Sequence, residues 1–138
     1  MTQEEKDLLL KDLCARLPYD VKVQYQVGNR LPSIEIFDTR QYNELIIGHY
    51  TDEWLKCTFK PYLFPLSSMT EEQYEKFKIV SGWDGDIEDI RRGKFSCIGY
   101  IGLDYIYDTI DWFNKNHFDY RGLIPMGLAI DATNLNVY

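Results

Sequence analysis

The fold of this chain is decided by a stretch near its N-terminus that runs Val21-Lys22-Val23-Gln24-Tyr25-Gln26-Val27. Valines and a tyrosine alternate in it with lysine and glutamines. A period of two residues is typical of a strand with one face buried and the other exposed. The sequence therefore predicts a half-buried strand over residues 21–27.

The segment before this strand has a helical period instead. Apolar residues recur at helical spacing over residues 9–17, and charged residues, among them Asp12 and Arg16, lie between them. Thr2 and Glu5 have the spacing of a capping box at the start of the segment, and Pro18 stops it. We expect an amphipathic N-terminal helix whose charged residues, including Asp12 and Arg16, face water.

Three more short strands are predicted after the first, at residues 34–36, 45–47 and 54–59. Turn residues separate them, and short strands joined by short turns favour an antiparallel sheet. The predicted fold class is therefore α+β: an N-terminal helix with a small four-stranded antiparallel sheet, for which a barrel-like form is open, followed by a mainly helical C-terminal part.

The second half of the chain begins with an apolar, proline-containing segment at residues 60–68, which we interpret as an extended strap over the core. Helices are predicted at residues 70–82 and 103–116, with a short helix at 119–123 and a closing strand at 128–130. Residues 83–102 favour a loop with one short strand at 95–98. We expect a helix-plus-sheet lobe at residues 1–66 and a helical lobe at 67–138, packed as one compact unit.

Composition narrows the possible partners. The net charge is −7, with 22 acidic against 15 basic residues, so nucleic acid and anionic membranes are unfavourable partners. No apolar run approaches the roughly 20 residues of a membrane span, and no signal peptide is recognised, so a cytoplasmic location is expected. Cys14, Cys57 and Cys97 form no paired motif and are expected to be reduced and mostly buried. A protein partner remains, and the oligomeric state stays open.

The sequence holds no complete metal, cofactor or catalytic motif. Its two histidines, His49 and His117, lie far apart and no local cysteine set accompanies them, so no zinc site is predicted. The acidic run that starts at Asp84 matches the first ligand positions of a calcium loop. The match then fails, because its sixth position is Asp89 where the loop needs glycine, and its twelfth is Phe95 where the loop needs glutamate. P-loop, dinucleotide and nucleophile-elbow motifs do not occur. We therefore expect no cofactor, no metal and no assigned catalytic residue.

One short connection gathers groups that are typical of binding sites. It joins an imidazole, a carboxylate, a phenol and a guanidinium at His117, Asp119, Tyr120 and Arg121. A structural role for the same residues is the alternative, with Asp119 as a helix cap and Arg121 paired with an acid. The aromatic residues Tyr62 and Phe64 of the strap complete the predicted binding set.

Two segments also carry a family resemblance. They are Lys60-Pro61-Tyr62-Leu63 with the following Pro65-Leu66-Ser67-Ser68-Met69-Thr70-Glu71-Glu72, and Asn116-His117-Phe118-Asp119-Tyr120-Arg121-Gly122-Leu123-Ile124 with Gly127-Leu128-Ala129. These motifs resemble an uncharacterised family of small proteins from gut anaerobic bacteria and their phages or other mobile elements. The resemblance implies a mobile-element context and brings no mechanism with it.

Two functions follow as hypotheses. The first is a non-catalytic binding or accessory protein of phage or mobile-element origin, which acts on a protein partner through the aromatic strap and the connection from His117 to Arg121. The alternative is a small hydrolase-like enzyme that uses His117 with Asp119 or Asp111 as an acid–base pair. The sequence favours the non-enzymatic hypothesis, because no catalytic set is complete.

Overall fold

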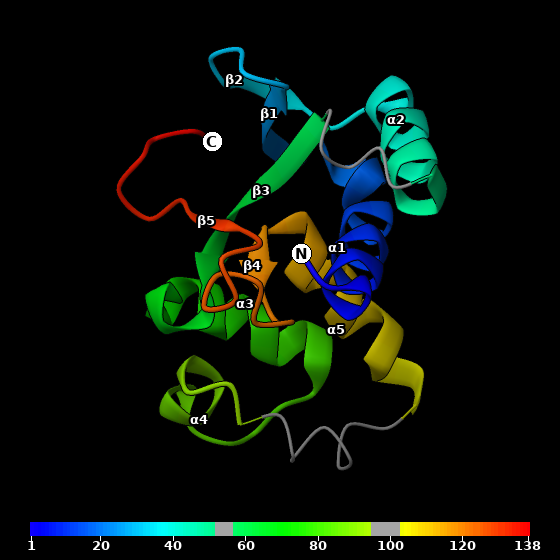
Figure 1. Cartoon of the computed structure of the whole chain (residues 1–138). Helices are drawn as coiled ribbons and strands as arrows, with labels where there is room; N and C mark the ends of the chain where they lie inside the picture. The colour runs from blue at the N-terminus through cyan, green and yellow to red at the C-terminus, as the bar shows by residue number, and fades with distance from the viewer. Residues whose placement is uncertain (52–56, 95–102) are drawn as a thin grey trace. The chain divides into compact units, whose positions relative to one another are not determined.

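The computed structural model describes residues 1–51, 57–94 and 103–138, and it confirms the α+β class with an N-terminal helix. The chain divides into two compact units (Figure 1). Unit 1 contains residues Met1–Leu63 and Arg121–Tyr138, and unit 2 contains residues Phe64–Tyr120. The expected lobe boundary at residue 66 stays a prediction.

Unit 1 holds most of the sheet. Its elements are α1 (Gln3–Arg16), the 3-10 turn η1 (Leu17–Tyr19), β1 (Lys22–Val27), β2 (Ser33–Ile36), α2 (Thr39–Thr51), the first residues of β3 (Cys57–Pro65) and β5 (Ile130–Asp131). The Thr2 side chain accepts a hydrogen bond from the Glu5 amide, and the Glu5 side chain accepts one from the Thr2 amide, so the predicted capping box starts α1.

Unit 2 is mainly helical. It contains the end of β3, the 3-10 turn η3 (Leu66–Ser68), α3 (Glu71–Ser81), α4 (Ile87–Arg91), α5 (Leu103–Lys115) and β4 (Phe118–Asp119). A second capping box, between Thr70 and Gln73, starts α3, and Gly82 ends it at a φ of 67°. The predicted helices at 70–82 and 103–116 are thus confirmed. The short helix α4 was not predicted, and the strand expected at 95–98 lies outside the described residues.

The sheet is mixed, and it is not closed into a barrel. Its strands follow the order β2-β1-β3-β4, and β5 pairs with β3 off this path. β1 pairs antiparallel with β2, as the short connection between them predicted, and also with β3, which follows only after α2, whereas β4 and β5 run parallel to β3. The parallel pairs follow from long connections, since a parallel strand can be reached only through a crossover.

The strand predicted at residues 45–47 is wrong, because these residues lie in α2. Asp38 starts this helix: its carboxylate accepts a hydrogen bond of 2.9 Å from the Gln41 amide. Gln41 and Leu45 are both buried, one turn apart. Sequence reasoning treated Asp38 as a strand breaker, whereas the same side chain is an N-cap, and the apolar run then continues as a helix face.

The segment interpreted as a strap is the central strand β3, which begins at Cys57; residues 54–56 of the predicted strand lie outside the described residues. Proline is tolerated at Pro61 because the backbone N–H groups of successive β3 residues point alternately toward β1 and away from it. The Phe37 amide donates to the Val21 carbonyl, which fixes the alternation along β1. Lys60 therefore bonds toward β1 and the nitrogen of Pro61 points away from it.

The helix predicted at residues 119–123 is also wrong. Phe118–Asp119 form β4, and the following residues are turns as far as Ala129. The closing strand is present but short, at Ile130–Asp131. Tertiary pairing with β3 overrides the local capping signal of Asp119 here, because the backbone of residues 118–119 bonds to the end of that strand.

Each unit has its own hydrophobic core. In unit 1, α1 and α2 pack on one face of β1 and β3 (Figure 1). The buried residues are Leu9, Leu13, Val21, Val23, Phe37, Leu45, Phe59, Leu63, Leu123, Leu128 and Ala129. In unit 2 the core is aromatic-rich and consists of Leu66, Met69, Tyr74, Phe77, Ile90, Phe113 and Phe118. Among the described residues, no helix has both the length and the apolar character needed to cross a membrane.

Candidate functional site

His117 lies at the corner where α5 ends. Its φ of 59° is left-handed, which is uncommon for any residue except glycine but is more frequent for histidine than for most. Its amide donates to the Asn114 carbonyl at 3.1 Å, and its own carbonyl accepts from the Phe64 amide at 2.8 Å. The backbone of His117 therefore terminates the helix and starts the pairing with β3, which is a structural role.

This role gives a testable prediction. Glycine adopts a left-handed φ without strain, so His117→Gly is expected to leave the free energy of unfolding unchanged or to raise it by up to about 1 kcal/mol. His117→Val is expected to lower it, because a β-branched residue resists this φ. Urea denaturation of the two variants and the wild type measures both effects. A large destabilisation by His117→Gly would instead show that the imidazole itself carries the fold.

Aromatic packing surrounds the rest of the connection in unit 2. The half-buried Tyr120 stacks on Phe113, with ring centroids 5.4 Å apart and planes 19° apart. The ring of Phe64 lies 6.5 Å from that of the fully buried Phe118. Asp119 is buried as well. Phe64 and Tyr120 thus contribute to the aromatic core of unit 2 and expose only part of their surface.

Arg121 belongs to unit 1, where it joins a buried charge cluster. Its Nε lies 3.2 Å from Oδ1 of Asp12. The same carboxylate accepts two hydrogen bonds from Arg16, of 2.7 Å and 3.1 Å, in a bidentate arrangement. Asp12 and Arg16 have no exposed surface. The expectation that they face water is therefore wrong, and the prediction that Arg121 pairs with an acid is confirmed.

The predicted binding set is therefore divided between the units. Tyr62 is also in unit 1, where it is 5% exposed and its carbonyl accepts a hydrogen bond from the hydroxyl of Tyr138. Within unit 2 the structure brings together the backbones of His117 and Phe64. Asp111, the alternative partner of His117 in the hydrolase hypothesis, is exposed on α5. Whether any of these residues has a functional role stays a prediction.

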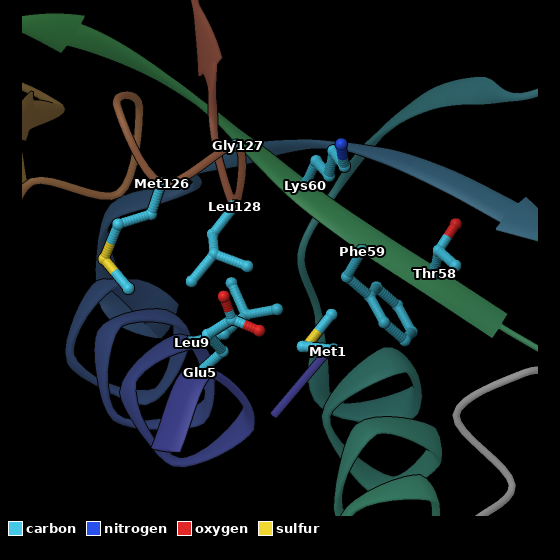
Figure 2. A pocket seen from close by; sticks show the side chains of 9 residues that line it. All are labelled: Met1, Glu5, Leu9, Thr58, Phe59, Lys60, Met126, Gly127 and Leu128. Carbon is cyan, nitrogen blue, oxygen red and sulfur yellow. The ribbon is translucent and has the colours of Figure 1, made fainter. Parts of the chain in front are cut away.

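A pocket of about 240 Å³ lies in unit 1, between α1, β3 and the turn before β5 (Figure 2). Its floor is apolar, with the buried side chains of Leu9, Phe59 and Leu128. Glu5 is the acidic residue of its lining, and the Lys60 side chain points away from it (Figure 2). The pocket has room for a short apolar group and is smaller than most ligand sites.

A polar cluster is half-buried between β1, α2 and β3. The hydroxyl of Tyr25 donates to the Glu44 carboxylate at 2.6 Å and lies 3.8 Å from the Cys57 sulfur. Burial and this bond to Glu44 raise the pKa of the Tyr25 hydroxyl, so it stays protonated at neutral pH. The cluster joins β1, α2 and β3 through these side chains. At a separate place in unit 1, burial also raises the pKa of the Tyr138 hydroxyl to about 12.

The described residues contain no group of three or more His, Cys, Asp and Glu side chains that could hold a metal ion. Asp86 of the acidic run caps α4 by accepting from the Glu88 amide. Cys14 and Cys57 are free thiols; Cys14 is exposed, contrary to the expectation of burial, and Cys97 lies outside the described residues, as does the side chain of His49.

Sequence reasoning missed an exposed apolar surface among the described residues of unit 1. It lies on β2 and the segment before it, where Leu31 is 93% exposed, Ile34 is 56% exposed and Ile36 is 50% exposed. We call these three residues the β2 patch. Because Ile34 and Ile36 are two residues apart in a strand, they point to the same face. Their alternation with Ser33 and Glu35 predicted a strand here, but it gave no indication that the apolar face is turned to solvent.

In comparisons with known proteins, no family model, no curated protein and no solved structure matches this chain.

Proposed function

We propose that this chain is a non-catalytic binding protein that acts in the cytoplasm on a protein partner, as an accessory component of a phage or mobile element. The observation that carries the proposal is the β2 patch of Leu31, Ile34 and Ile36. Large apolar side chains exposed on one strand and just before it are typical of protein interaction surfaces. The context of phages and mobile elements rests on the motif resemblance alone.

The geometry of β2 supports an interaction role. Within the described part of the chain, β1 is the strand that pairs with β2, so β2 forms an edge of the sheet. Proteins usually protect such edges with charges, prolines or covering segments, because an apolar edge recruits other chains. Here Pro32 precedes the strand, yet Ile34 and Ile36 are exposed. Leaving this apolar surface exposed to water is unfavourable unless a partner covers it.

The test compares capture by the wild type and by Ile34→Lys/Ile36→Lys. Both side chains are exposed, so the double variant is expected to fold, which circular dichroism checks. Ile79→Lys is the matched control, because Ile79 is 81% exposed on α3 in unit 2. We expect a partner that the wild type and the control both retain from a host lysate, and whose affinity, measured with the purified partner, falls at least about tenfold in the double variant.

Equal binding of every captured protein by the double variant would contradict the proposal. Hydrolysis of a simple ester or phosphoester that is lost in His117→Gly, whose backbone tolerates this φ, and kept in Ile79→Lys would not fit a binding protein either, and it would favour the hydrolase alternative.

A further inference from the structure

The backbone of β2 offers hydrogen-bonding groups beside the exposed side chains. The Phe37 amide donates to the Val21 carbonyl at 2.9 Å, so the backbone of Phe37 faces β1. Successive residues of an antiparallel strand alternate between facing the neighbouring strand and facing away from it. The N–H and C=O groups of Ile34 and Ile36 therefore point to the free edge, where a further strand can pair with them.

An exposed basic residue lies at one end of this edge, in a chain whose net charge is −7: Arg30, just before the strand, makes no ion pair with a described residue. At the other end Lys22 lies opposite Ile36 in the register of β1 and β2, but its ammonium group donates to the Val137 carbonyl and lies over the ring of Tyr138. The carboxylate of Glu35 is held by Arg40 at 3.2 Å and by the Gln41 side-chain amide at 2.7 Å. The charge of Arg30 favours an acidic group in the partner at that end of β2.

We infer that the partner adds an extended segment to β2 as a new edge strand, and that this segment has an apolar centre and an acidic group at the end that lies next to Arg30. The inference rests on the proposed function and names how its surface is used. The backbone groups of Ile34 and Ile36 hold the segment by main-chain hydrogen bonds. Their side chains pack against alternate residues of the segment, and Arg30 selects its acidic end.

A second copy of this chain is a poorer occupant of the same edge. Pairing two β2 strands about a two-fold axis with both apolar faces on one side allows three nearby registers, centred on Glu35, on Ile34 or on Ile36. The first places Glu35 opposite the Glu35 of the second copy, and like charges in that position are destabilising. The second places Ile36 opposite Pro32, which has no N–H to donate. The third places Ile34 opposite Asp38, which lies beyond the end of β2 and starts α2. Two chains of net charge −7 also repel each other.

The experiment uses a short synthetic peptide with a centre of alternating valine and threonine and aspartates at both ends. Binding to the full chain is measured by fluorescence anisotropy, and amide hydrogen exchange is followed residue by residue. We expect binding that weakens with added salt, and new protection of the Ile34 and Ile36 amides but not of Glu35, whose amide already faces β1. A peptide N-methylated on the edge-facing residues is expected to bind at least about tenfold more weakly.

Equal affinity of the N-methylated and parent peptides would overturn strand addition, and equal affinity of a peptide with lysine flanks would overturn the charge preference. Protection of Ile34 and Ile36 that rises with protein concentration in the absence of peptide would assign the edge to a second copy instead. The proposed function survives these results if capture of a protein still depends on Ile34 and Ile36. It fails separately if that dependence is absent.

Discussion

Replacing Asp12 by asparagine is expected to lower the free energy of unfolding by about 3–5 kcal/mol, the usual cost of removing one partner from a buried ion pair. The substitution keeps the size of the side chain and removes its charge. It strands the guanidinium of Arg16, which has no exposed surface, and weakens the contact with Arg121. A domain of this size is stable by only about 5–15 kcal/mol, so this loss is a large part of the total.

Urea denaturation monitored by circular dichroism measures the change. Glu72→Gln is the matched control, because Glu72 forms a comparable pair with Lys76 one helical turn away, at 3.2 Å, with both side chains exposed. The expected loss there is below about 1 kcal/mol. Replacing Asp12, Arg16 and Arg121 together by leucine, methionine and leucine is expected to recover much of the stability. If Asp12→Asn is as mild as Glu72→Gln, the buried cluster does not hold unit 1 together.

Phe118→Ala is expected to cost about 3–5 kcal/mol in unit 2, the range for a fully buried aromatic side chain. The ring of Phe118 has no exposed surface and stacks on Trp112, with centroids 5.6 Å apart and planes 13° apart. It also meets Phe113 edge to face at 6.4 Å. Its removal leaves a cavity at the centre of the aromatic core and takes away both ring contacts.

Thermal and urea unfolding of Phe118→Ala, followed by tryptophan fluorescence, measures this loss, because Trp83 and Trp112 both pack against the core of unit 2. Tyr107→Ala is the control on the same helix region: Tyr107 is 79% exposed on α5, and its removal is expected to change stability by less than about 0.5 kcal/mol. Similar midpoints for the two variants would mean that the aromatic cluster contributes little to unit 2.

The elements that could be predicted from sequence are those whose local signals agree with their surroundings. The capping boxes at Thr2 and Thr70 start α1 and α3 where expected, and the period of two residues at β1 became a strand, although its polar face is half-buried and not exposed. Prediction from the sequence pattern fails where the same residue type is compatible with two different local structures. Asp38 is compatible with a turn between strands or with a helix cap, and only the tertiary burial of Gln41 and Leu45 decides for α2.

The charged residues show a second limit. Asp12 and Arg16 occupy the buried face of α1, yet helical periodicity assigns a charged residue to water by default. Their burial depends on their pairing and on Arg121, which lies far away in the sequence, so no local window contains the reason. The β2 patch was missed for a similar cause: alternation identifies the apolar face of a strand but not which side of the sheet the helices cover.

The division of the chain has a consequence for its synthesis. Unit 2 is one uninterrupted run of sequence, whereas unit 1 is made of two segments that flank it. On the ribosome, every residue of unit 2 is synthesised before Arg121–Tyr138, the second segment of unit 1. Until Arg121 and Leu123 leave the exit tunnel, Asp12 of the nascent helix α1 lacks its contact with Arg121, and the apolar face of α1 lacks the core residue Leu123. The part of the molecule that is translated first is therefore the part that is completed last.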